Sequence, residues 1–123
     1  MATQQDLATQ VMGELQLLPA GQVASAADYD TISTRYLQKM LYLQDEDYAD
    51  WDTSASSSTE LIPDAAMPGL IRVMAWEIAP QYNVPRSSLV DPKGQTYEDV
   101  GLSLLRRYMR MKPSYESIRA EYF

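Results

Sequence analysis

The chain has no cysteine and no histidine among its 123 residues, and these two absences remove most of the side chains that carry enzyme chemistry. Without cysteine there is no disulfide framework and no thiolate nucleophile or metal ligand. Without histidine the chain lacks the commonest general base and the commonest ligand of zinc and copper. Glycine-rich phosphate loops and Gly-x-Ser-x-Gly nucleophile elbows do not occur either. We therefore expect a protein that is not an enzyme and that holds no cofactor and no metal.

Long apolar runs are also missing, since none approaches the roughly 18 to 20 residues that a membrane-spanning helix needs. The first residues do not show the basic region and apolar core of a secretory signal. A length of 123 residues and an apolar content of 46% suit one domain with a modest core. We expect a soluble protein that contacts no membrane and stays where it is made, unless an assembly carries it away.

The net charge of −7 is distributed unevenly along the chain. Residues 1–64 carry eleven acidic and two basic side chains, whereas residues 65–123 carry six acidic and eight basic ones. This balance disfavours wrapping of nucleic acid over the whole surface, because phosphate attraction needs a net basic face. It would instead allow identical copies to place an acidic surface against a basic one in a ring.

Apolar residues recur at spacings of three and four in four segments, which predicts four amphipathic helices. We expect helices over residues 3–18, about 26–45, between Asp64 and Pro80, and from Tyr97 to the residue before Pro113. Their apolar stripes are Leu7, Val11, Leu15 and Leu18; Tyr29, Ile32, Tyr36, Met40 and Leu43; Met67, Leu70, Ile71, Val73, Met74 and Ile78; and Tyr97, Val100, Leu104, Tyr108 and Met111. The fold class is therefore all-α, a small bundle of about four helices with an extended C-terminal arm, in which the third helix is central.

Cap and turn residues set the expected bounds of these helices. Ser25 and Thr96 each precede an acid by three residues, the form of a reciprocal cap, and Asp64 can cap the central helix. The residues Pro19-Ala20-Gly21 should end the first helix, Pro80 should stop or kink the third, and Asp91-Pro92-Lys93-Gly94 has the composition of a reverse turn.

Some apolar residues lie beside the main stripes. Leu37 and Leu41 broaden the stripe of the second helix, so we expect that helix to touch neighbours on two sides. Leu105 and Met109 widen the face of the last helix, and Gly101 leaves room there for a close neighbour. Trp51 is expected to cover the core.

An acidic stretch follows the second helix, with five acids among residues 45–52. A calcium loop is disfavoured, because the stretch lacks the turning glycine and the distal bidentate glutamate. The remaining interpretations are a solvated helix end, an acidic rim or channel surface of a ring that repels DNA, and, as a separate class, a hydrolase that uses these acids with a divalent ion.

A basic cluster of Arg106, Arg107, Arg110 and Lys112 lies near the end of the last helix, where cations complement the helix dipole. Two functional interpretations remain open: contact with nucleic acid, and contact with the acidic surface of a neighbouring subunit. For the second, we expect intersubunit charge contacts between two groups. These groups are Arg106, Arg107 and Arg110 on one side, and Asp45, Glu46 and Asp47 on the other.

The residues after Pro113 are too apolar and aromatic for a solubilising tail. We therefore divide the chain into a helical domain, residues 1–112, and a C-terminal interaction arm, residues 113–123. Aromatic side chains supply a large contact area at low entropic cost, which favours docking of the arm on another chain. The alternative is a tail that folds back on its own domain. The arm residues expected to bind a partner are Tyr115, Ile118, Arg119, Tyr122 and Phe123.

The order of several short motifs resembles the head-to-tail adaptor proteins of tailed bacteriophages, also called head-completion or neck proteins, of the tail accessory factor type. A first helix ends in Leu-Leu-Pro-Ala-Gly at residues 17–21, and a second helix with paired aliphatic residues ends near Trp51. The central helix opens with Ile62-Pro63-Asp64 and closes with Ala-Pro-Gln-Tyr-Asn-Val at residues 79–84, before a fourth helix. The resemblance extends from about Leu7 to Tyr108.

This resemblance implies a structural virion protein at the head-to-tail interface that is assembled in the host cytoplasm. Such adaptors form a ring, typically of twelve subunits, beneath the portal protein of a filled head. The ring extends the DNA channel without sequence-specific binding, helps to retain packaged DNA, and offers a platform for tail, stopper or nozzle proteins. Family members use a C-terminal segment to hold the portal or a neighbouring subunit, which the resemblance assigns to residues 115–123 here. The family has no catalytic residues, and this chain departs from some relatives in its short tail.

A second hypothesis from a different class is a small helical DNA-binding or regulatory protein. It would use the face that carries Arg106, Arg107 and Arg110.

Overall fold

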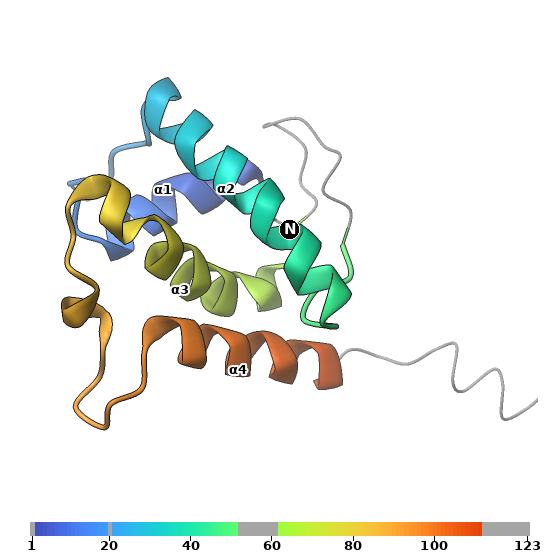
Figure 1. The fold of residues 1–123 in the computed structure, drawn as a ribbon. Coiled ribbons are helices and arrows are strands. Elements are labelled where there is room, and N and C mark those ends of the chain that lie inside the picture. The colour runs from blue at the N-terminus through green and yellow to red at the C-terminus, as the bar shows by residue number, and fades with distance from the viewer. Residues whose placement is uncertain (1, 20, 52–61, 112–123) are drawn as a thin grey trace, which may run out of the picture.

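The computed structural model describes residues 2–19, 21–51 and 62–111 (Figure 1). These residues form four α-helices and three short 3-10 helices, and within them the only β-type pairings are two isolated bridges, Ala2 with Ile62 and Val90 with Thr96. The α-helices are α1 (Gln4–Glu14), α2 (Ala26–Asp45), α3 (Met67–Ile78) and α4 (Tyr97–Met111), and the 3-10 helices are η1 (Asp64–Ala66), η2 (Ala79–Tyr82) and η3 (Arg86–Leu89). The all-α prediction is confirmed. None of the helices in the described ranges combines the length and apolarity needed to cross a bilayer.

Helix α3 lies at the centre of the bundle and contacts α1, α2 and α4 (Figure 1). Its predicted stripe is confirmed, since Leu70, Val73, Met74 and Ile78 have no exposed surface. The predicted cap at Asp64 was wrong. The chain enters through η1, and neither η1 nor α3 has a side-chain cap at its N-terminus.

Two prolines fit the ends of α3. Pro68 lies in the first turn, where its missing N–H costs no helical hydrogen bond. At the other end the α-helix stops at Ile78, and Pro80 begins the tighter η2 turn, as its ring and missing donor require.

A close backbone contact joins α3 to α4 through two glycines. A Cβ atom on Gly101 would lie 2.6 Å from Val73 Cγ2 and 2.7 Å from the Gly69 carbonyl oxygen. A Cβ atom on Gly69 would lie 2.8 Å from the Gly101 carbonyl oxygen. The predicted close neighbour of Gly101 is therefore confirmed, and it is the backbone of α3.

This contact also sets the rotation of α4. Leu105, one turn after Gly101, has no exposed surface, whereas Leu104 is only partly buried. The sequence pattern placed Leu104 at the centre of the face and Leu105 at its margin, and that assignment was wrong. The reason is that the glycine pair, rather than the largest side chains, determines which side of α4 meets α3.

Helix α1 ends earlier than the apolar spacing predicted. Thr3 and Asp6 form a full capping box, with the Asp6 amide donating to Thr3 Oγ1 at 3.0 Å and the Thr3 amide donating to Asp6 at 3.1 Å. The helix stops at Glu14 because Gln16 has a φ of 60°, and the Leu17 amide then donates to the Met12 carbonyl at 2.9 Å. The apolar spacing continues past the helix because Leu15 is still buried after the chain has turned.

Helix α2 has the predicted bounds. Of its predicted stripe, Ile32, Tyr36, Met40 and Leu43 are buried, and Tyr29 is partly buried. Ser25 caps it, accepting from the Asp28 amide at 3.2 Å. A reciprocal cap would have the Asp28 carboxylate accept from the Ser25 amide. Here the Asp28 carboxylate instead accepts from the Ser25 hydroxyl at 3.0 Å.

The connection into α4 is a confirmed reverse turn. The Gly94 amide donates to the Asp91 carbonyl at 3.0 Å, and Gly94 has a φ of 85°, which suits glycine. Thr96 then caps α4 by accepting from the Asp99 amide at 3.1 Å.

Candidate interaction surface

The described part of the acidic stretch, residues 45–51, forms a turn whose acids face solvent, whereas its Ala49 and Trp51 face the core. Asp47 has a φ of 61°, and the Tyr48 amide donates to the Leu43 carbonyl at 2.7 Å. The chain therefore reverses within one turn of the helix end. The side chains of Asp45, Glu46 and Asp47 are exposed, whereas Ala49 and Trp51 are buried.

Trp51 anchors this turn. Its side chain is buried, as predicted for a residue that covers the core, and its Nε1–H donates to the Tyr36 hydroxyl at 2.8 Å. Burial raises the pKa of Tyr36 to about 12, and the hydrogen bond from Trp51 offsets part of that rise. Tyr36 is therefore a neutral structural acceptor near pH 7, and the turn is attached to the middle of α2.

The C-terminal half of α4 packs against the same turn. The Arg106 guanidinium donates to the Tyr48 hydroxyl at 2.7 Å, and the Tyr108 hydroxyl donates to the Asp50 carboxylate at 3.1 Å. The Tyr108 ring meets the Trp51 ring edge-on, with 5.9 Å between centroids. Burial raises the pKa of Tyr108. The ends of α2 and α4 therefore lie side by side (Figure 1).

This packing brings both predicted charge clusters to one end of the molecule. Asp45, Glu46 and Asp47 are exposed at the end of α2, and Arg107 and Arg110 are exposed on α4. Arg106 is also exposed, but its guanidinium engages Tyr48 of its own chain. The assignment of these six residues to contacts between subunits stays a prediction. If these residues do contact a neighbouring subunit, that neighbour must meet acidic and basic side chains at the same end of the molecule.

A row of two stacked aromatic rings with a cation at each end connects this end to the outside of α2. Lys39 Nζ lies 4.7 Å from the Tyr42 ring centroid, Tyr42 stacks on Tyr48 at 6.5 Å, and the Arg106 guanidinium carbon lies 5.2 Å from the Tyr48 ring. Cations over aromatic faces are attracted by the ring quadrupole. The row therefore fixes the position of Tyr42, which is 45% exposed. Sequence reasoning missed this row, because Tyr42 lies beside the predicted stripe and Tyr48 lies inside an acidic loop.

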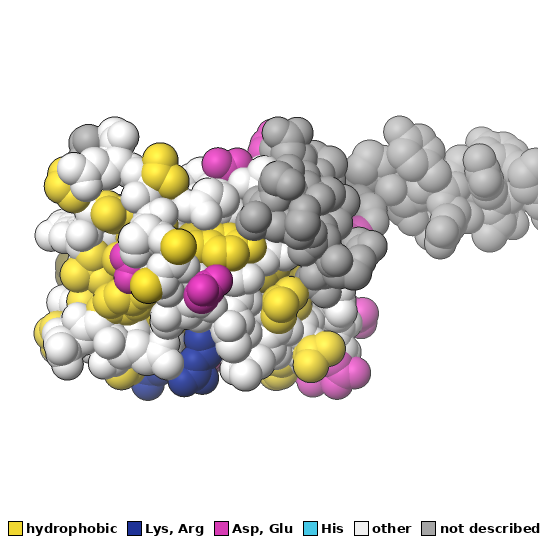
Figure 2. Space-filling model, turned by 90° about the horizontal axis from the view of Figure 1, so that it is seen from above, with side chains coloured by type: hydrophobic (Ala, Val, Ile, Leu, Met, Phe, Trp, Pro, Cys, Tyr) yellow, Lys and Arg dark blue, Asp and Glu magenta, His cyan; other side chains and the backbone are white. Residues whose placement is uncertain are grey.

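Two leucines of α2 also face outward. Leu37 is 41% exposed and Leu41 is 72% exposed, and the two are one helical turn apart. We call Leu37, Leu41 and Tyr42 the α2 outer face. Figure 2 views the molecule from the side on which α2 lies and shows hydrophobic side chains among polar ones there. The prediction that α2 would touch neighbours on two sides is met on its inner side, while the described residues leave the outer face uncovered.

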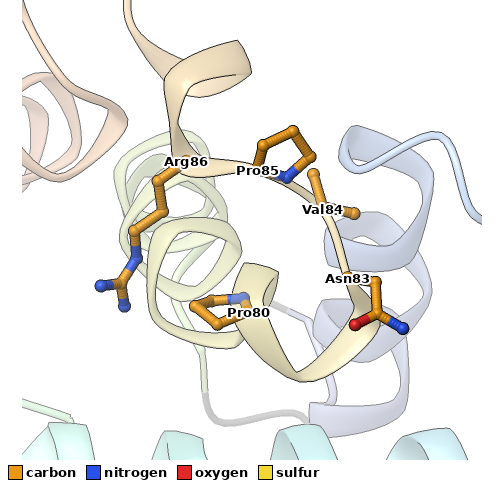
Figure 3. A pocket seen from close by; sticks show the side chains of 5 residues that line it. All are labelled: Pro80, Asn83, Val84, Pro85 and Arg86. Atoms are coloured by element: carbon orange, nitrogen blue, oxygen red, sulfur yellow. The ribbon is translucent and has the colours of Figure 1, made fainter.

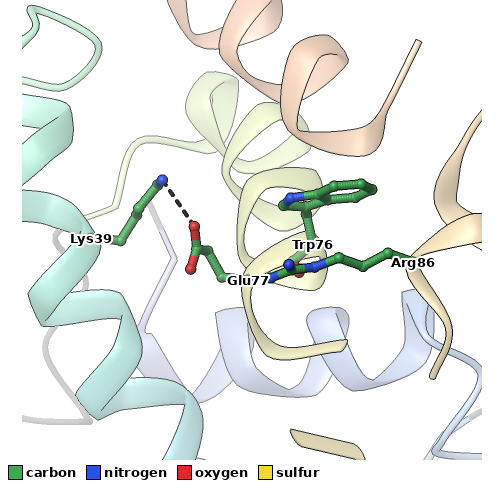
Figure 4. A network of polar contacts seen from close by, with 4 residues as sticks. All are labelled: Lys39, Trp76, Glu77 and Arg86. Carbon is green, nitrogen blue, oxygen red and sulfur yellow. Dashed lines mark hydrogen bonds and ion pairs between the residues drawn. The ribbon is translucent and has the colours of Figure 1, made fainter. Parts of the chain in front are cut away.

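Other polar contacts are clamps between elements. Lys39 pairs with Glu77 at 3.0 Å and connects α2 to α3 (Figure 4). Arg86 donates through Nε to the Trp76 carbonyl at 3.1 Å, and its guanidinium carbon lies 5.1 Å from the Trp76 ring (Figure 4). Both cations have their partners within the chain, so these contacts stabilise the bundle.

A shallow groove lies where the chain curls between η2 and η3 (Figure 3). Its shape comes from Asn83, whose φ of 58° turns the chain after η2. Arg86, the one charged residue that lines it, points away from the centre of the curl in Figure 3. The lining offers no group of convergent polar side chains, and its members are Pro80, Asn83, Val84, Pro85 and Arg86.

Two sets of candidate residues remain. In the described part of the chain, no three Asp, Glu, His or Cys residues are grouped so that they could hold a metal ion. The five predicted arm residues, Tyr115, Ile118, Arg119, Tyr122 and Phe123, lie outside the described residues. The described part of the candidate surface therefore consists of the α2 outer face and the charged end formed by α2 and α4.

Comparison with known proteins adds no assignment. No protein-family model, no curated protein and no solved structure matches this chain.

Proposed function

We propose that this chain is a head-to-tail adaptor of a tailed bacteriophage, a structural virion protein that forms a ring beneath the portal. In that position it extends the DNA channel, helps to retain packaged DNA and provides the attachment platform for tail, stopper or nozzle proteins. The observation that carries the proposal is the α2 outer face, which exposes Leu37, Leu41 and Tyr42 on a helix whose inner side already fills the core.

The outer face supports a role in assembly because it leaves apolar side chains of a helix exposed to water. Contiguous exposed apolar side chains mark contact sites for other proteins, and closed rings bury such faces repeatedly. Among the described residues, the other large exposed apolar side chains, Leu17, Val23 and Val90, belong to connecting segments rather than to an α-helix. The sequence resemblance to phage adaptors points to the same kind of assembly.

The charge distribution supports the proposed role of the ring as a channel for DNA. A subunit with a net charge of −7 gives a ring wall that repels DNA phosphates, so DNA can pass without adhering. The exposed acids at residues 45–47 and the exposed Arg107 and Arg110 lie at one end, where they can orient a neighbour or the portal.

Electron microscopy of the chain mixed with portal protein of the same phage tests this function. We expect negative-stain images to show an added ring on one side of the portal assembly, with a symmetry that matches the portal. A chain that stays strictly monomeric and leaves the portal images unchanged would end the proposal.

A small DNA-binding protein is the second candidate, because Arg107 and Arg110 are both exposed on α4, three residues apart. Three exposed acids at the same end oppose phosphate attraction, and Arg106 already donates to Tyr48. A salt-dependent shift of duplex DNA by the isolated chain, lost when Arg107 and Arg110 are replaced by glutamine, would favour this candidate over the adaptor.

A further inference from the structure

We infer that, in the free subunit, the α2 outer face is the docking site of the chain's own C-terminal segment, residues 115–123. This inference concerns the protein before assembly and goes beyond the proposed ring. It pairs the uncovered α2 outer face with an apolar segment of the same chain.

The face has the anatomy of a contact site. Leu37 and Leu41 form an apolar ridge along α2, while Tyr42, which contacts Lys39 and Tyr48, lies about 100° around the helix from Leu41. A polar groove between α2 and η2 flanks the ridge, and Thr34, Arg35, Gln38 and Gln81 are among its lining residues. An apolar centre with a polar rim is typical of surfaces that bind protein segments.

The C-terminal segment has the complementary pattern. Tyr115, Ile118 and Tyr122 follow at spacings of three and four, which would place them on one side of a short helix. Arg119 adds a cation next to this stripe, and Asp45 is an exposed acid one turn beyond Leu41 on α2. A helix with this stripe can lie along the ridge of α2, as amphipathic helices lie in apolar grooves.

The end of α4 places this segment close to the face. Arg106 contacts Tyr48, Tyr48 stacks on Tyr42, and Met111 follows Arg106 by about 7.5 Å along the helix axis. Residues 112–114 can bridge about 10 Å when extended, and residues 112–123 about 40 Å. The segment can therefore reach the outer face of its own chain without distortion of the bundle.

The tether selects the chain's own segment over that of a second copy. A short covalent connection gives the segment an effective concentration of about 1 mM at the face, which exceeds the micromolar concentration of other copies in a dilute solution. Docking covers two apolar surfaces that would otherwise both face water. On assembly, a portal or neighbouring subunit would replace this internal contact.

Because the chain has no cysteine, engineered thiols test the contact without background. Leu41→Cys combined with Ile118→Cys is compared with Ser87→Cys combined with Ile118→Cys, since Ser87 is exposed on η3, away from α2. Under mild oxidation of the dilute chain, we expect an intramolecular disulfide in the first pair at least about tenfold faster than in the second, because the bond requires Cα atoms within about 7 Å. Equal rates, or disulfide-linked dimers as the main product, would overturn the inference.

A second measurement leaves the segment unchanged. Docking should protect the bond after Arg119 from trypsin, so Leu41→Glu should speed that cleavage by about fivefold or more as the open population rises. Gln10→Glu adds the same charge on the exposed side of α1, outside the docking face, and should leave the rate near that of the unmodified chain. Equal rates in all three proteins would contradict docking. Both experiments use the isolated chain, so their outcome is independent of whether a ring forms on the portal.

Discussion

At the scale of single residues, the buried pair of Tyr36 and Trp51 joins the acidic turn to the core. Tyr36 is 1% exposed, and its hydroxyl accepts the Trp51 Nε1–H at 2.8 Å. A buried donor without a partner costs about 1–3 kcal/mol. This pair therefore determines how firmly the turn, and with it the charged end of α2, is held.

Replacement of Tyr36 by phenylalanine should lower the free energy of unfolding at pH 8 by about 1–3 kcal/mol, because Trp51 keeps its buried N–H and loses the acceptor. The loss should shrink at high pH. Burial raises the folded pKa of Tyr36 from 10.0 to about 12, so the folded state keeps a proton that the unfolded state releases above pH 10. The stabilisation by the unmodified phenol is full below pH 10 and is lost as the pH rises through about 12.

Urea unfolding at pH 8 and pH 11, followed by tryptophan fluorescence, measures this difference. The gap between Tyr36→Phe and the unmodified chain should be smaller at pH 11. A gap of equal size at both pH values would show that Tyr36 is not the buried, proton-retaining group described here.

Sequence reasoning at this scale found the burial of Trp51 and missed its partner. The aromatic ring after an acidic stretch indicates a residue that covers the core, but the Tyr36 hydroxyl lies fifteen positions earlier on α2. Only the reversal of the chain at Asp47 brings the two together. A left-handed backbone at aspartate has no reliable signature in a single sequence.

At the scale of elements, the glycine contact between α3 and α4 dominates the packing. Gly69 and Gly101 place the two backbones against each other, and Leu105 enters the core beside them. The sequence predicted the four helices, the stripe of α3 and the bounds of α2. It did not predict the rotation of α4 or the early end of α1, because both depend on backbone contacts that apolar spacing does not report.

Gly101→Ala should destabilise the bundle by about 2 kcal/mol or more, although alanine is the better helix former, because its Cβ would lie 2.6 Å from Val73 Cγ2 and the helices would have to separate. Gly13→Ala is the matched control within α1. A Cβ on Gly13 would meet nothing within 4 Å, so this change should stabilise the chain by about 0.5–1 kcal/mol.

Thermal unfolding followed by circular dichroism separates the two glycines. The description of the α3–α4 contact predicts shifts of opposite sign. It would be contradicted by a Gly101→Ala protein that melts at or above the temperature of the unmodified chain.

At the scale of the whole molecule, the subunit combines a closed core with an open exterior on α2. The core was predictable from sequence, since the inward stripes of α2 and α3 are the predicted ones. The outer face was predictable only in part. Leu37 and Leu41 were recognised as a second apolar side, but one sequence does not tell whether a neighbouring helix or another chain covers it.

Removal of residues 114–123 should leave the helical bundle intact and abolish assembly on the portal, because the proposed adaptor uses Tyr115, Ile118, Tyr122 and Phe123 as its apolar contact with the partner. Circular dichroism checks the fold, and electron microscopy of mixtures with portal checks the assembly. Ring formation by the shortened chain at the normal concentration would remove the arm from the account.

Replacement of both Arg107 and Arg110 by glutamate should weaken assembly at low salt more than at high salt, because exposed charges act through a screened field. Lys93→Glu, in the exposed turn before α4, is the control for added negative charge. Mass photometry over a series of salt concentrations measures the effect. Identical behaviour of the two variants would argue against a role for the basic cluster between subunits.

Sedimentation velocity of the purified chain, alone and mixed with portal assemblies of the same phage, tests the central claim most directly. The adaptor account predicts a boundary at which the chain travels with the portal in a fixed ratio set by the symmetry of the portal. A chain that sediments as a single monomeric species in every mixture, with the portal boundary unshifted, would contradict it.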